Sequence, residues 1–394
     1  MAVLKYNHTI AFFLAFLLLF LADSVVNYYV DLPLFVAGGL ILLPLMIVFS
    51  KLEVKNFLTM LFIIIVFIIT AVTNSILYVY NEKNISDALF ICLFVTSYYF
   101  YLGRYEEIRS LPVIIFAIAS LLLFIPTFFG INAGGSTLDT GSHDIEFQRE
   151  YNQGFYRIAH IASYFFGFFT IFFLFKYSIS KKLSQIIFAL IFFAACLYTG
   201  ARTFLLAGLL AVAFYYMKNL KLRYIIAIAV FIIIIFVIRP YILEITRKTV
   251  LYQYFTIFET TVENPKRLSR FMIWRSWWGE MKYFSLRDFI TGRAYYNAHL
   301  TNWRKLNYDV WFHNDYFNIV YSYGLICLAL YLYFIVQIFL QFKEKIMNNL
   351  FIWTFFFSMV IAAFLNGLYY YFPVFLIYIF FYMMKYQTKT QIKI

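Results

Sequence analysis

Residues 56–79 read NFLTMLFIIIVFIITAVTNSILYV, a stretch without a charged side chain. A helix that crosses the hydrocarbon core of a bilayer needs about 20 mostly apolar residues, and this stretch meets that requirement. The rest of the chain is similar, since 64% of all residues are hydrophobic and 13% are charged. Soluble domains contain roughly 45–50% apolar and about 25% charged residues. The composition therefore excludes a water-soluble globule and predicts an all-α, polytopic integral membrane protein.

Apolar runs separated by charged or Pro-, Gly- and Asn-rich breaks predict about twelve transmembrane helices in a single membrane domain, residues 1–394. They are expected near residues 8–24, 32–50, 56–79, 87–103, 110–129, 158–176, 184–199, 202–217, 222–239, 316–341, 350–365 and 369–385. The first is interpreted as a transmembrane helix because no small-residue cleavage site follows its apolar run. Two polar segments, residues 130–157 and the larger 240–312, interrupt the series.

The distribution of basic residues predicts the orientation of the chain. With the N-terminus inside, sixteen basic residues fall in the inner segments and four in the outer loops before residue 239. Because cytoplasmic loops carry the excess of Lys and Arg in membrane proteins, both polar segments are expected to face outward.

The large outer loop has its own excess of positive charge, with twelve basic and six acidic residues between positions 239 and 309. Long loops escape the positive-inside rule, so topology does not require this excess. Two interpretations remain open. The charge lies in water or against anionic lipid headgroups, or it binds a phosphate-bearing substrate at the outer face.

His313-Asn314-Asp315 stands at the mouth of the expected helix 316–341. The positive end of a helix dipole lowers the pKa of a nearby histidine and favours the neutral imidazole at pH 7. A neutral imidazole can accept a proton from a sugar hydroxyl as a general base. Asn314 or Asp315 can cap the helix or orient the ring. An interfacial histidine beside a capping residue is the alternative interpretation.

Arg202 lies in a very short outer turn between two expected helices. A permanent cation at a helix N-terminus is unfavourable unless an anion binds there, so Arg202 is a candidate phosphate ligand. Snorkelling of its side chain to the headgroups is the alternative.

Residues 267–284 are expected to contain a helix in the plane of the membrane interface. Its apolar face combines residues at helical spacing, namely Trp274, Trp277, Trp278 and Met281. Arg275 flanks this face, whereas Arg270 falls near its centre, where a plain amphipathic helix carries an apolar residue. Both arginines are candidates for substrate binding, although an arginine at a helix end can also snorkel.

Several classes of function lack their signature in the sequence. The expected spans carry almost no ionisable residues, which ion-coupled transporters need within the membrane. There is no P-loop, dinucleotide-binding glycine pattern or zinc motif. We therefore expect no cofactor and no metal.

The histidine motif resembles that of the bacterial O-antigen polymerase/O-antigen ligase superfamily. His313-Asn314 is followed after nine residues by Gly324, as in the family. Cys327 stands where the family pattern has Gly, Thr or Tyr.

Two further segments resemble the same superfamily. Residues 199–203 are similar to its Ser-Arg turn, with Ala201 in place of the usual serine. Arg270 and Trp274 match its Arg-x-x-x-Trp segment in the large outer loop. The order of the three motifs along the chain also matches.

The resemblance implies an inverting, metal-independent glycosyl transfer from an undecaprenyl-diphosphate-linked glycan, at the periplasmic face of a bacterial inner membrane. It implies that His313 is the general base and that Arg202 and Arg270 hold the diphosphate. The implied partners are a lipid-linked oligosaccharide donor and acceptor, membrane lipids and a chain-length regulator, with no nucleic acid.

Polymerases and ligases share this scaffold and differ in the acceptor, which is another lipid-linked repeat unit or the lipid A core. The abundance of Phe, Ile, Tyr, Asn and Lys fits AT-rich coding, which is common in surface-polysaccharide gene clusters, and favours a polymerase. A lipid-linked oligosaccharide flippase is the alternative from another functional class.

Overall fold

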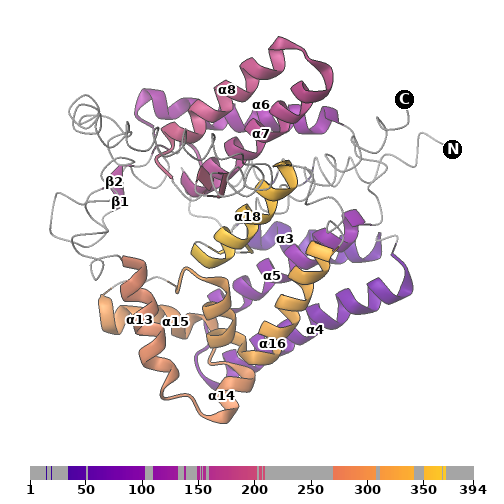
Figure 1. Cartoon of the computed structure of the whole chain (residues 1–394). Coiled ribbons are helices and arrows are strands. Elements are labelled where there is room, and N and C mark those ends of the chain that lie inside the picture. Colours follow the sequence, from indigo (N-terminus) through magenta and orange to yellow (C-terminus); the bar gives the residue numbers. More distant parts are fainter. Residues whose placement is uncertain are drawn as a thin grey trace, which may run out of the picture. The chain divides into compact units, whose positions relative to one another are not determined.

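The computed structural model of the chain describes Ala15, Leu19 and residues 34–49, 52–102, 110–131, 137–138, 149–150, 152, 154–156, 159–201, 204–205, 207–208, 269–307, 311–340, 350–365 and 367–369. This part of the chain is mostly helical (Figure 1). Its only strands, β1 (Thr137–Leu138) and β2 (Arg149–Glu150), form a short antiparallel pair. The all-α prediction is therefore confirmed for the described residues.

The chain divides into two compact units. The first unit comprises residues 1–125, 272–340 and 362–394, and the second comprises residues 126–271 and 341–361.

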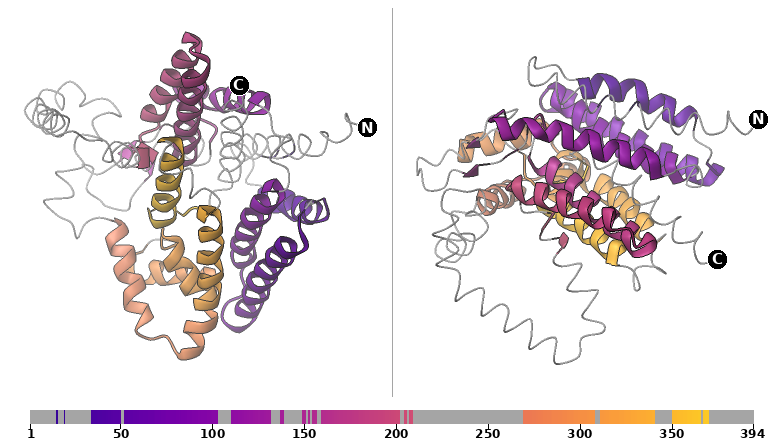
Figure 2. Two further views of the ribbon diagram at one scale, coloured as in Figure 1. Left: turned by 45° about the vertical axis from the view of Figure 1, so that its right-hand side comes forward. Right: turned by 90° about the horizontal axis from the view of Figure 1, so that it is seen from above.

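The first unit combines helices from the beginning of the chain with helices that follow residue 272. They are α3 (Leu34–Val48), α4 (Val54–Leu77), α5 (Glu82–Leu102), α6 (Ser110–Phe124), most of α13 (Ser269–Met281), α14 (Leu286–Thr291), α15 (Tyr295–Leu306) and α16 (Asp315–Leu340). Helices α4 and α5 lie side by side (Figure 2), and α16 packs against α4, α14 and α15. Early and late parts of the sequence thus share one core.

The second unit contains the helical hairpin of α7 (Ala159–Ser180) and α8 (Leu183–Tyr198), with most of α18 (Leu350–Leu365) and of the short 3-10 helix η2 (Ile125–Phe129). Helices α7 and α8 pack through phenylalanine rings, and Phe173 stacks on Phe192 with 5.5 Å between ring centroids. Lys181 adopts a left-handed conformation with φ 54° between the two helices, a common way to end a helix.

The described helices coincide with many of the expected spans. Helices α3 to α8, together with α16 and α18, match the spans expected near residues 32–50, 56–79, 87–103, 110–129, 158–176, 184–199, 316–341 and 350–365. The spans expected near 8–24, 202–217, 222–239 and 369–385 lie wholly or largely outside the described residues. Two described helices, residues 54–77 and 315–338, are long and apolar enough to cross a membrane.

Helix α4 exposes a continuous apolar stripe. Its exposed members follow one another at intervals of three or four residues, which places them on one face of the helix: Val54, Leu58, Phe62, Ile65, Ile69, Val72 and Ile76. Val54 is 73% exposed and Ile76 is 77% exposed, so the stripe runs the whole length of the helix. An apolar surface of this extent marks an interaction with lipid or with protein.

Candidate functional site

His313 lies in the short turn that leads into α16. Trp311, Phe312, Asn314 and Asp315 are all buried, whereas His313 is half-buried. The backbone of His313 has φ 51°, a left-handed conformation that few non-glycine residues adopt, although histidine is enriched among them. Such strain persists only when the surrounding structure imposes it. The turn therefore presents one imidazole from an otherwise buried stretch of chain.

The residue before His313 is fixed by packing. Phe312 lies in a hydrophobic cluster with Ile273, Ala298 and Tyr321. Its carbonyl oxygen accepts a hydrogen bond of 3.2 Å from Nε1 of Trp274. Phe312 thus connects the turn to both α13 and α15, which raises the cost of moving the backbone at His313.

Asn314 caps two helices. Its Oδ1 accepts a hydrogen bond of 3.1 Å from the amide of Phe317, and its Nδ2 donates a bond of 3.1 Å to the carbonyl oxygen of Phe364. The first bond satisfies a free N–H at the start of α16, and the second a free C=O at the end of α18. Asn314 is fully buried and its amide is used at both ends, so the structure shows it as a cap, and its role in substrate binding stays a prediction.

Asp315 does not orient the imidazole through the bonds that the structure describes. Its Oδ2 accepts hydrogen bonds of 2.7 Å from the hydroxyl of Tyr331 and from the amide of Leu368. The imidazole of His313 contacts the indole of Trp311, with ring centroids 5.1 Å apart. Of the two roles expected for these neighbours, capping falls to Asn314, and Asp315 connects α16 to the segment after α18.

The tryptophan face of α13 is largely occupied by protein. Trp274 and Trp277 pack against the cluster around Phe312, and Trp277 stacks on Phe317 with centroids 4.1 Å apart. Of the three tryptophans expected on one interfacial face, Trp278 is the exposed one, at 64%. Trp274 and Trp277 thus pack α13 on the start of α16, and the location of this helix at the membrane interface stays a prediction.

The candidate arginines differ in how far the structure describes them. Arg275 lies on α13 with its side chain exposed, and Arg270 lies in the first turn of α13. Arg202 lies outside the described residues. The structure thus brings His313 and Asn314 together in one turn, while the phosphate-binding role of the arginines stays a prediction.

Gly324 breaks α16. It has φ 79° and ψ −178°, a combination that essentially only glycine adopts. The segment around Gly292, with φ 78°, crosses α16 here, and a Cβ at either glycine would overlap the backbone of the other segment. The amide of Arg293 donates to the carbonyl oxygen of Tyr321 at 2.7 Å. The glycine of the histidine motif is therefore needed for this crossing of two backbones.

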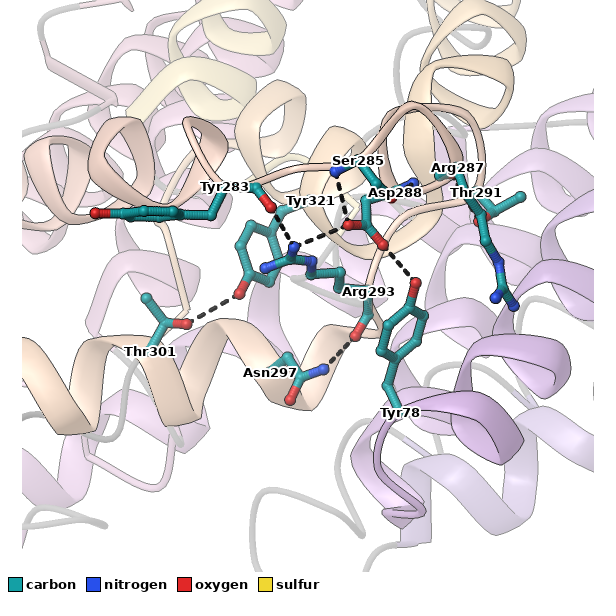
Figure 3. A network of polar contacts seen from close by, with 10 residues as sticks. All are labelled: Tyr78, Tyr283, Ser285, Arg287, Asp288, Thr291, Arg293, Asn297, Thr301 and Tyr321. Carbon is teal, nitrogen blue, oxygen red and sulfur yellow. Dashed lines mark hydrogen bonds and ion pairs between the residues drawn. The ribbon is translucent and has the colours of Figure 1, made fainter.

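An ion pair fixes the segment that makes this crossing (Figure 3). Oδ2 of Asp288 accepts from Nη2 of Arg293 at 2.8 Å, and Oδ1 accepts from the hydroxyl of Tyr78 at 2.5 Å. Ser285 and Asp288 form a capping box at the start of α14. Burial opposes ionisation of Asp288, but the bonds from Arg293, Tyr78 and Ser285 outweigh it and hold the pKa of Asp288 well below its usual value. The Ser285-x-x-Asp288 spacing is the sequence signal that could have revealed this element.

A third carboxylate, after Asp315 and Asp288, is buried in the first unit. Asp87, in the first two turns of α5, is 1% exposed. Its Oδ2 accepts from the hydroxyls of Tyr323 at 2.8 Å and Tyr369 at 3.3 Å. The Tyr369 hydroxyl also accepts from Nδ2 of Asn318 at 2.6 Å. Sequence reasoning missed this network because its members lie far apart along the chain.

No known protein family matches this chain when it is compared with family profiles, and no curated protein matches it significantly.

Proposed function

We propose that this chain is an O-antigen, or surface polysaccharide, polymerase. It is a membrane-embedded glycosyltransferase that moves a glycan from undecaprenyl diphosphate onto another lipid-linked repeat unit, with inversion, at the periplasmic face. The observation that carries the proposal is the single half-buried imidazole of His313, held in a left-handed turn whose other residues are buried.

Membrane embedding is supported by two features of the described residues. Residues 54–77 and 315–338 are long and apolar enough to cross a bilayer. The stripe on α4 exposes apolar side chains from Val54 to Ile76, and lipid is the environment in which such a stripe costs nothing. Together with the composition, these features support a protein embedded in a membrane, and we propose about twelve transmembrane helices in the cytoplasmic membrane.

A common outer face is supported by contacts among the segments expected there. The hydroxyl of Tyr78, after α4, bonds to Asp288 of α14. Oδ1 of Asn84, in the first turn of α5, accepts from the amide of Tyr296 in α15 at 2.7 Å. In the proposed topology, the turn between α4 and α5 and the large loop are both periplasmic. These contacts are therefore consistent with a topology in which both segments lie on the same side of the membrane.

In the proposed reaction, His313 takes the proton from an acceptor sugar hydroxyl as that oxygen bonds to the anomeric carbon of the donor. The bond from the anomeric carbon to the diphosphate oxygen breaks, and undecaprenyl diphosphate leaves with the electron pair. Arg202 and Arg270 stabilise its charge, and Arg275 on α13 is a further substrate-binding residue. A diphosphate held in this way is a good leaving group, so the reaction needs no metal and no cofactor.

Deletion of the gene tests the proposal and separates polymerase from ligase. A polymerase deletion leaves a single repeat unit on the lipid A core in a gel of the surface polysaccharide. A ligase deletion leaves bare core and accumulates lipid-linked polymer. An unchanged ladder of long chains would refute both activities.

The network at Asp87 favours a transporter, such as a lipid-linked oligosaccharide flippase, as the second candidate. Asp87 and Asp315 are both fully buried in the first unit, and each accepts from tyrosine hydroxyls. Buried carboxylates within helices are typical of ion-coupled transport, and the sequence had suggested almost no ionisable groups there. Cysteine labelling at mid-helix positions discriminates, because a transporter exposes the same positions to both sides in turn.

A further inference from the structure

Asp315 joins the start of α16 to the chain segment that follows α18. Its Oδ2 accepts from the amide of Leu368 and from the hydroxyl of Tyr331, each at 2.7 Å. One fully buried carboxylate thus fixes the backbone of a residue more than fifty positions away.

The segment held by Asp315 supports the ring that contacts His313. Gly367, directly before Leu368, has φ 87°, and a Cβ at this position would overlap the indole of Trp311 and lie 3.0 Å from Oδ1 of Asp315. Trp311 therefore lies directly on the Gly367 backbone. The same indole contacts the imidazole of His313, with ring centroids 5.1 Å apart. A continuous series of contacts leads from Asp315 through residues 367–368 and Trp311 to His313.

Stability alone gives a weak reason for a carboxylate at this position. Two uncharged side chains already join the same parts of the chain, since Asn314 bonds to Phe364 and Asn318 bonds to Tyr369. Burial of a carboxylate is costly unless hydrogen bonds compensate. Oδ1 of Asp315 has no hydrogen-bond partner among the described residues. The free-energy cost of burying this carboxylate is accounted for if Asp315 holds residues of the site in position.

We infer that Asp315 is a positioning residue: by fixing Leu368 and Gly367 it holds Trp311 in place and thereby sets the orientation of the His313 imidazole. This inference rests on the proposed function as far as catalysis is concerned, but the contacts also predict an effect on His313 itself. Loss of the anchor lets Trp311 move and makes His313 more accessible.

The test compares Asp315→Ala with Asn318→Ala in the full-length protein in membranes. Both changes remove a buried link between α16 and the segment 367–369, but only Asp315 acts on Trp311 through Leu368. The first readout is the rate at which diethyl pyrocarbonate modifies His313, measured by mass spectrometry. The second is kcat and KM for chain synthesis from lipid-linked repeat units.

We expect faster modification of His313 in Asp315→Ala and the wild-type rate in Asn318→Ala. We also expect kcat to fall about 100-fold in Asp315→Ala, as for a displacement of about 1 Å, with KM little changed. An unchanged modification rate in Asp315→Ala, or an equal rise in both variants, overturns the inference. If Asp315→Ala alters the modification rate of His313 but the wild-type protein synthesises no chains, the proposed function is refuted and the positioning role of Asp315 stands.

Tyr331→Phe keeps the test decisive if Asp315→Ala fails to fold. It removes one bond to Asp315 without changing charge or the backbone of residues 367–368. We expect the modification rate of His313 to rise in Tyr331→Phe, but by less than in Asp315→Ala, where the whole anchor is lost. A modification rate equal to that of the wild type in a folded Tyr331→Phe protein contradicts the inference.

Discussion

Replacement of Gly324 by alanine tests the crossing of two backbones at the centre of the first unit. Gly324 has φ 79° and ψ −178°, and this conformation costs a non-glycine residue about 1–3 kcal/mol. The new methyl group would also overlap the carbonyl of Ile290 and the amide of Thr291. These are backbone atoms, so the overlap is relieved only when the two segments separate.

Separation of the segments breaks hydrogen bonds that have no substitute. The amides of Arg293 and Ala294 donate to the carbonyl oxygens of Tyr321 and Ser322 at 2.7 and 3.2 Å. A buried polar group that loses its partner costs about 1–3 kcal/mol. We therefore expect Gly324→Ala to lower the free energy of unfolding by about 3 kcal/mol or more.

The assay is thermal unfolding of the purified protein in detergent, with Gly279→Ala as the matched control. Gly279 lies inside α13, and a Cβ there would meet only the end of the Lys305 side chain. Alanine is favoured over glycine in a helix by about 0.5–1 kcal/mol, so the control should be as stable as the wild type or more stable. A Gly324→Ala protein as stable as the wild type would refute the crossing as described.

Three further predictions concern other parts of the site. Asp288 has a depressed pKa in the folded state, so its contribution to stability is complete above the unfolded value of about 3.9 and is lost as the pH falls below it. The free energy of unfolding, measured against pH, should therefore lose this pH-dependent contribution in Asp288→Asn. An identical pH profile in the variant would contradict the pairing with Arg293. Asn314→Ala removes two helix caps and should cost about 2–4 kcal/mol, whereas a change below 0.5 kcal/mol (about the effect of an ordinary surface substitution) would argue against this role. Arg202→Ala and Arg270→Ala should nearly abolish chain synthesis, and lysine at either position should restore part of it, because lysine keeps the charge but loses bidentate contacts with phosphate; normal synthesis in both alanine variants would exclude the proposed clamp.

The sequence predicted the helices better than it predicted their environment. Apolar runs place α4 and α16 within a few residues of their observed ends, because the length of an apolar run is a local property of the chain. The burial of Asp87 is not local, since it depends on Tyr323 and Tyr369 from the other end of the chain. A carboxylate at a helix end looks the same in sequence whether it meets water or two tyrosines.

In the candidate site, too, local features could be predicted from the sequence and tertiary contacts could not. Capping at the start of α16 follows from residue type, and Asn314 is indeed the cap. The second bond of Asn314, to Phe364, and the packing of Trp274 and Trp277 on protein required the tertiary structure. Gly324 was recognised as part of a motif, but its reason, close contact with the backbone at Ile290, is visible only in three dimensions.

The most direct test of the account is the rate of chain synthesis by a His313→Asn protein. Asparagine tolerates the left-handed backbone that His313 adopts at φ 51°, but it cannot take up a proton at neutral pH. His160→Asn, which changes a half-buried histidine of α7, is the matched control. If His313 is the general base, the rate falls by about 10²–10⁴-fold in His313→Asn at normal protein levels and is kept in the control. A His313→Asn protein that forms long glycan chains at the wild-type rate would contradict the central claim.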